Sequence, residues 1–145
     1  MVEITNIDGI KTFIRDDAIT VISGPYPHDP DYCSYVRGAF GPGPLITAED
    51  ALHLADRLAL ARPLTLLTRP NNTPVWINAS AVTIVRFPFD TELADPPSLV
   101  QSVVMVGSFH QALREDVATA HRILLANGLN VATLTGDHGQ RFKSL

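Results

Sequence analysis

Cysteine, basic residues and long apolar runs are scarce in this sequence of 145 residues, and each shortage excludes a class of protein. The single cysteine, Cys33, has no partner for an intramolecular disulfide, as expected in a reducing compartment. Lys and Arg number 11 against 15 Asp and Glu, whereas nucleic-acid-binding domains normally carry a basic surface. No apolar run approaches the length of about 18 residues that indicates a membrane span, and the first residues show no signal-peptide pattern. We therefore expect a cytoplasmic protein that binds no nucleic acid and has no membrane span.

Catalytic and metal-binding patterns are missing as well. The run Gly41-Pro42-Gly43-Pro44 lacks the Lys and the following Ser or Thr of a phosphate-binding loop. Neither Gly-x-Ser-x-Gly nor His-Glu-x-x-His occurs. A metal site gathers three or four ligands, whereas the histidines are dispersed singly at His28, His53, His110, His121 and His138. We therefore expect no enzymatic activity, no metal site and no cofactor.

Strand-forming residues are abundant, and they occur in two matching stretches. The stretch Pro74–Arg86 is rich in β-branched and aromatic residues and matches Thr12–Ser23 at a constant offset of 63 positions. The matched pairs are Phe13 with Trp76, Ile14 with Ile77, Ala18 with Ala81, Thr20 with Thr83 and Ile22 with Val85. This agreement indicates one small unit written twice.

The turns and helices of the two stretches agree in the same order. Asp8-Gly9 and Asn71-Asn72 each mark a tight turn, because Asn tolerates the left-handed conformation that Gly adopts freely. A helix capped by Thr47 is predicted from the apolar stripe at Ala51, Leu54, Ala55 and Leu58. A second helix begins near Val117, and Gly128 is placed to end it.

The predicted fold class is therefore α+β, with one domain over residues 1–145 built of two tandem β-β-β-α repeats. The first repeat covers residues 2–62 and the second covers residues 64–127, while residues 128–145 form a C-terminal strand and tail. We expect the repeats to form one pseudo-twofold sheet, or a flattened barrel, with the two helices packed on it.

Three single residues each allow two interpretations. Cys33 is either a small core residue or, with a lowered pKa, a nucleophile, and a cysteine in a strand favours the core. His121 is either a packed histidine or a candidate ligand-binding or pH-sensitive residue. Trp76 is either a core anchor or an interface hot spot.

The second half resembles a small bacterial family, the FlbD-type flagellar and swarming-motility proteins. The resemblance rests on Leu67-Thr68-Arg69, the Asn71-Asn72 turn, Val75-Trp76-Ile77-Asn78 with Ala81-Val82, the strand Val103 to Gly107, and the helix from Val117. This chain differs from the family pattern in its Asn-Asn turn, in a long insertion between Arg86 and Val103, and in its duplication. The resemblance implies a non-enzymatic accessory protein.

We therefore expect a protein-interaction module of bacterial or prophage type that occupies or bridges the surface of an unknown partner protein. The alternatives are a small-ligand-binding protein that uses the cleft between the repeats, or a phage-type inhibitor of a host protein. The strand Val103–Val106 is apolar on both faces and needs cover on both. This predicts a homodimer or a higher homo-oligomer with interface residues Val104, Val106 and Phe109, where Val106 takes the place of Arg37 in the first repeat.

Overall fold

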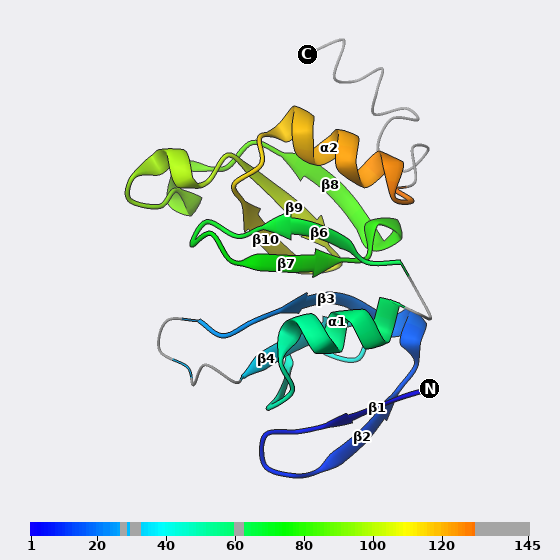
Figure 1. Ribbon diagram of the computed structural model, residues 1–145. Helices are drawn as coiled ribbons and strands as arrows, with labels where there is room; N and C mark the ends of the chain where they lie inside the picture. The colour runs from blue at the N-terminus through cyan, green and yellow to red at the C-terminus, as the bar shows by residue number, and fades with distance from the viewer. Residues whose placement is uncertain (27–28, 30–32, 60–62, 130–145) are drawn as a thin grey trace.

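The computed structural model describes residues 1–26, 29, 33–59 and 63–129 (Figure 1). In the first half the elements are β1 (Val2–Thr5), β2 (Lys11–Ile14), β3 (Ile19–Ser23), β4 (Ser34–Gly38), β5 (Leu45–Thr47) and α1 (Ala51–Ala59). In the second half they are β6 (Thr65–Thr68), β7 (Pro74–Ile77), β8 (Val82–Arg86), β9 (Ser102–Val106), β10 (Phe109–Leu113) and α2 (Val117–Ala126). The fold class is α+β, as predicted, and the expected C-terminal strand and tail at residues 128–145 lie almost wholly outside the described residues.

In the described part of the chain five strands precede each helix, so the expected β-β-β-α order is wrong. Two strands were not predicted: β5, which has only three residues after the Gly-Pro loop, and β10. β10 follows a tight turn at Gly107, whose φ of 62° is in the left-handed region. The sequence predicts the end of a strand at Gly107, whereas the structure has a hairpin turn there that pairs β10 with β9.

The strands divide among three antiparallel sheets, so the prediction of one sheet is wrong. The largest has the order β5-β4-β3-β7-β6, the second has the order β10-β9-β8, and β1 pairs with β2. None of these sheets closes into a barrel within the described part of the chain. A 3-10 turn, Ala79–Ala81, separates β7 from β8 and sends β8 into a different sheet; Asn78 caps this turn by accepting from the Ser80 amide at 3.1 Å.

The first three strands of each half have the same spacing but different partners. The bounds of β6, β7 and β8 follow those of β1, β2 and β3 by 63 residues. The intervening turns also agree, because Gly9 and Asn72 both have a positive φ, of 88° and 67°. However, β7 pairs with both β6 and β3, whereas β2 pairs with β1 alone among the described residues.

The register of β9 corrects the position assigned to Val106. In the first half Gly38 lies opposite Ile19, and in the second half Val106 lies opposite Val82. Val106 therefore corresponds to Gly38. The expected match of Val106 with Arg37 is wrong by one residue.

Two apolar clusters form the core, and each contains residues from both halves. One joins Leu67 and Ile77 of the β6–β7 hairpin to Leu124 of α2, and it includes Val21 of β3. The other joins the stripe of α1 to the β1–β2 hairpin, and it includes Trp76 of β7. Trp76 is 8% exposed, which confirms its interpretation as a core anchor.

The helices begin at aspartates. Asp116 accepts a hydrogen bond from the Thr119 amide at 2.7 Å and caps α2. The expected cap of α1 at Thr47 is wrong, since Thr47 ends β5 and accepts from the Glu49 amide. Asp50 takes the capping role, with its carboxylate 3.3 Å from the His53 amide.

Candidate interaction surface

The residues that were assigned to an interface lie mostly inside a single chain. Val104 and Val106 are 0% and 4% exposed and belong to the core cluster that α2 covers. Their assignment to an interface is therefore wrong, because the chain itself covers both faces of β9. Phe109 is half-buried, with the Arg37 guanidinium 4.1 Å from its ring centroid.

His121 is half-buried on α2. The cleft expected between the repeats is occupied, along the line where β3 meets β7, by the hydrogen-bonded pairing of those two strands. His28 and His138, two further histidines of the sequence analysis, lie outside the described residues.

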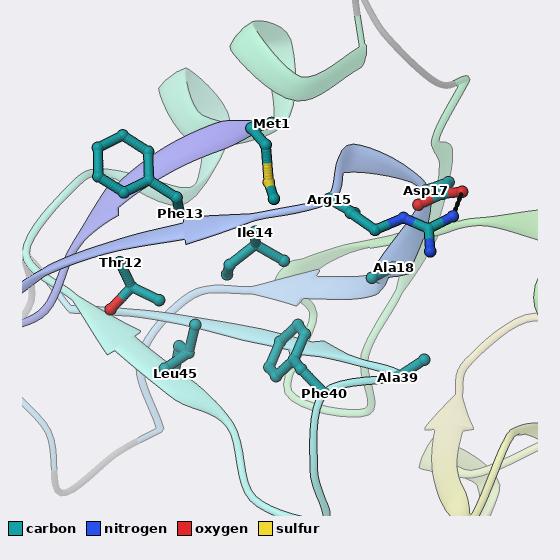
Figure 2. A pocket seen from close by; sticks show the side chains of 10 residues that line it. All are labelled: Met1, Thr12, Phe13, Ile14, Arg15, Asp17, Ala18, Ala39, Phe40 and Leu45. Carbon is teal, nitrogen blue, oxygen red and sulfur yellow. Dashed lines mark hydrogen bonds and ion pairs between the residues drawn. The ribbon is translucent and has the colours of Figure 1, made fainter.

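An apolar hollow of about 570 Å³ opens beside β2, and we call it the β2 hollow (Figure 2). Figure 2 shows side chains of β2 on one side of it and those of Phe40 and Leu45 on the other. Its lining comes entirely from the first half: Met1, Thr12, Phe13, Ile14, Arg15, Asp17, Ala18, Ala39, Phe40 and Leu45. This site was not predicted from the sequence, where Phe13 served only as the match of Trp76.

Phe13 is the most informative residue of the β2 hollow. It lies opposite Glu3 in the β1–β2 hairpin, as Trp76 lies opposite Leu66 in the β6–β7 hairpin. Trp76 is 8% exposed, whereas Phe13 is 63% exposed. Trp76 packs in the core cluster that contains the stripe of α1, on a strand with partners on both sides. Phe13 belongs to neither core cluster, and the edge of β2 away from β1 has no partner strand in the described chain.

A second open strand edge belongs to β8. Among the described residues β8 pairs only with β9, and Ile84 on it is 45% exposed. Next to it Arg86 makes two hydrogen bonds to Glu92, of 2.6 and 2.7 Å, and lies 3.9 Å from the ring centroid of Phe89. The bonds from Arg86 and the Phe89 amide lower the pKa of Glu92 to about 2, so the loop after β8 is held by a charged pair.

A polar cluster where β3 ends and β4 begins contains side chains that could take part in chemistry. The Tyr35 hydroxyl donates to Asp29 at 2.6 Å, and this bond raises the pKa of Tyr35 to about 12. Burial raises the pKa of the Cys33 thiol. Arg69 is buried and donates to the carbonyl groups of Gly24 and Pro25.

These pKa directions favour a structural role for the cluster. Tyr35 keeps its proton at neutral pH, and Cys33 stays a thiol rather than the thiolate that a nucleophile requires. Cys33 is 2% exposed, in agreement with its interpretation as a core residue. The hydrogen bonds of Tyr35 and Arg69 tie the loop after β3 to the sheet.

Comparisons with family models, with curated proteins and with solved structures find no match to this chain. Within the residues that the structure describes, no helix has the length and apolar character needed to cross a membrane.

Proposed function

We propose that this protein is a non-enzymatic interaction module of bacterial or prophage type, which acts by occupying or bridging the surface of a partner protein. The observation that carries the proposal is an open strand edge that coincides with exposed apolar side chains. Met1, Ile10 and Phe13, on or beside the β1–β2 hairpin, are 82%, 60% and 63% exposed. Large apolar side chains gathered at an unpaired edge are typical of a protein-binding surface.

Strand addition is the binding mode that this surface supports best. An unpaired edge offers a row of backbone N–H and C=O groups that an extended partner segment can match, and adjacent apolar side chains then supply specificity. The ion pair between Arg15 and Asp17, at 2.6 Å, lies just after the end of β2, while Phe13 within the strand stays exposed. A protein partner uses both the edge and the hollow.

The repeat organisation is part of this proposal. The equal spacing of β1–β3 and β6–β8 supports a duplicated unit, with repeats at residues 2–62 and 64–127. A further likeness is that the Ser34 hydroxyl donates to the Glu49 carbonyl, as the Ser102 hydroxyl donates to the Glu115 carbonyl. If a complete pseudo-twofold axis related the two repeats, β2 would pair with β8 in the same way as β7 pairs with β3. A motility role of the FlbD type and a role as a phage-type inhibitor both stay predictions.

Site-specific photo-crosslinking tests the interaction surface. A benzophenone amino acid replaces Phe13 in cells that carry the gene, and a matched chain carries it at Leu66, which is 58% exposed on the corresponding hairpin. We expect a covalent protein adduct of defined mass at position 13 and none at position 66. Excess wild-type chain should suppress the adduct, whereas excess Phe13→Arg chain should not. Equal adducts at the two positions, or none at either, would overturn the proposal.

A further inference from the structure

Among the described residues, each half of the chain forms an open row of strands with two outer edges. In the first half the end of the β1–β2 hairpin meets β5, through the bridge between Asn6 and Thr47 and the hydrogen bond from the Ile7 amide to the Ile46 carbonyl at 2.9 Å. The strands therefore follow one another as β2-β1-β5-β4-β3. The free edges of this half are β2 and β3.

The second half repeats the arrangement. The Arg114 amide donates to the Thr68 carbonyl at 2.9 Å, which joins the end of β6 to the end of β10. The strands follow one another as β7-β6-β10-β9-β8. The free edges of this half are β7 and β8, the counterparts of β2 and β3 in sequence spacing.

One pair of these edges is joined within the chain. β3 and β7 pair antiparallel, with Ile22 opposite Trp76, and the Asn78 amide extends the ladder by donating to the Thr20 carbonyl at 2.8 Å. The junction buries Val21 and Ile22, which are 1% and 0% exposed. It shows that an edge of the β3 type and an edge of the β7 type fit each other in this sequence.

The other pair, β2 and β8, is left over. Figure 1 shows the β1–β2 hairpin at one end of the molecule and β8 with α2 at the other, so the two edges do not meet within one chain. We propose that β2 of one chain pairs antiparallel with β8 of a second copy, in the register of the β3–β7 junction. This inference rests on the interaction surface proposed above and names a second copy of the chain as its partner.

The register can be transferred residue by residue at the offset of 63 positions. Since Val21 lies opposite Ile77 and Ile22 lies opposite Trp76, Ile84 should lie opposite Ile14 of the other copy. Val85 should then lie opposite Phe13, and the Arg15 amide should donate to the Thr83 carbonyl.

The exposure of Phe13 and Ile84 fits the missing partner, whereas Ile14 is already buried within one chain. Phe13 is 63% exposed where Trp76 is 8%, and Ile84 is 45% exposed where Val21 is 1%. Pairing with a second copy would place Val85 beside Phe13 and Ile14 beside Ile84, and so reduce the exposure of both side chains. Exposed apolar side chains on both edges supply the favourable burial that the backbone ladder alone lacks.

The charges beside the two edges are compatible with this pairing. Each cation next to an edge has its own carboxylate: Lys11 lies 3.4 Å from Glu3, Arg15 lies 2.6 Å from Asp17, and Arg86 lies 2.6 Å from Glu92. The junction therefore brings no uncompensated like charges together. Because the two edges are different and lie at opposite ends, the contact is head-to-tail, and it closes into a ring or extends along a line.

Two edge variants and their mixture test the proposal. The wild-type chain should self-associate in light scattering coupled to size exclusion. Phe13→Arg damages only the β2 edge and Ile84→Arg only the β8 edge, and both side chains are exposed in one chain, so each variant should be a folded monomer by circular dichroism. Leu66→Arg, at an exposed site away from both edges, should associate as the wild type does.

The mixture decides the head-to-tail geometry. The Phe13→Arg chain keeps an intact β8 edge and the Ile84→Arg chain keeps an intact β2 edge, so mixing the two monomers should produce a heterodimer with one junction. Variants that associate like the wild type, or a mixture that stays monomeric, would overturn the inference. A wild-type chain that is monomeric at high micromolar concentration would also overturn it. In that case the proposed function still stands if position 13 crosslinks to a different protein.

Discussion

At the scale of single residues, environment and not residue type separates Phe13 from Trp76. Both are aromatic, and both occupy the same position of a hairpin. Trp76 packs in the core cluster around α1 and lies beside β3, whereas Phe13 lines the β2 hollow. Large-to-small substitutions measure this difference directly, because their cost follows the packing that is lost.

Trp76→Ala should lower the free energy of unfolding by about 3–5 kcal/mol, as expected for truncation of a buried aromatic side chain. Phe13→Ala is the matched control and should change it by no more than about 0.5 kcal/mol, as at other surface positions. Denaturant unfolding followed by circular dichroism, at dilution where only monomer is present, measures both. A loss below about 1 kcal/mol for Trp76→Ala would contradict its place in the core.

Glu92 makes stability depend on pH in an acidic window. The hydrogen bonds from Arg86 come first among the causes that lower the pKa of Glu92 to about 2, from an ordinary value of 4.5. The folded state therefore favours the charged carboxylate. Its contribution to stability is fully present above pH 4.5 and is lost as the pH falls from 4.5 toward 2.

The comparison of wild type with Glu92→Gln isolates that contribution, because all other carboxyl groups are shared. The wild-type chain should be the more stable above pH 4.5, and the difference in free energy of unfolding should shrink as the pH approaches 2. Unfolding curves at a series of pH values measure it. A difference that does not change over this range would show that the Arg86–Glu92 pair does not hold the loop after β8.

At the scale of elements, Gly38 sets how closely β4 approaches the turn before β3. A Cβ atom at this position would lie 2.1 Å from the Ala18 carbonyl oxygen, which accepts a hydrogen bond from the Ala39 amide. Gly38→Ala must therefore push two backbone segments apart. We expect a loss of about 1–3 kcal/mol, as for other overpacked sites.

Gly43→Ala is the control for this prediction, because a Cβ atom at Gly43 meets no atom within 4 Å. It should leave the free energy of unfolding almost unchanged in the same denaturant series. Equal stability of the two variants would mean that β4 moves away from the turn at no cost.

The sequence predicts elements whose signals are local. The strand β7, the turn at Asn71-Asn72 and the apolar stripe of α1 appear where periodicity and turn chemistry place them. The division of the strands among three sheets was not predictable in this way, because strand partners are set by contacts between distant segments. β9 illustrates the difference: its need for cover on both faces was read correctly, but the cover comes from within the chain.

The candidate site was less accessible to sequence reasoning than the fold. Phe13 matches a core tryptophan, so its pattern indicates burial, but it belongs to neither core cluster and lies on a strand without a second partner in the described chain. Val106 shows the opposite error. Aligning the two halves one residue out of register matched Val106 with Arg37 and so predicted a solvent-facing position. The two halves go out of register here because β4 and β9 are joined to their following strands by loops of different length.

At the scale of the whole molecule, the two halves share their cores. Val21 of the first half packs in the cluster that α2 covers, and Trp76 of the second half packs in the cluster that α1 covers. Neither cluster is complete without a residue from the other half. The halves should therefore unfold together rather than as two independent units.

Trp76 allows this cooperativity to be measured, because it is the only tryptophan of the chain and lies at the crossing between the halves. In a denaturant series, the fluorescence of Trp76 and the circular dichroism of the whole backbone should change with the same midpoint and slope. Val21→Ala, which removes packing from the other cluster, should shift both transitions equally, because loss of one cluster unfolds the other. A fluorescence midpoint that stays in place while the circular dichroism moves would show that the halves are separate folding units. The prediction of a single domain would then be wrong.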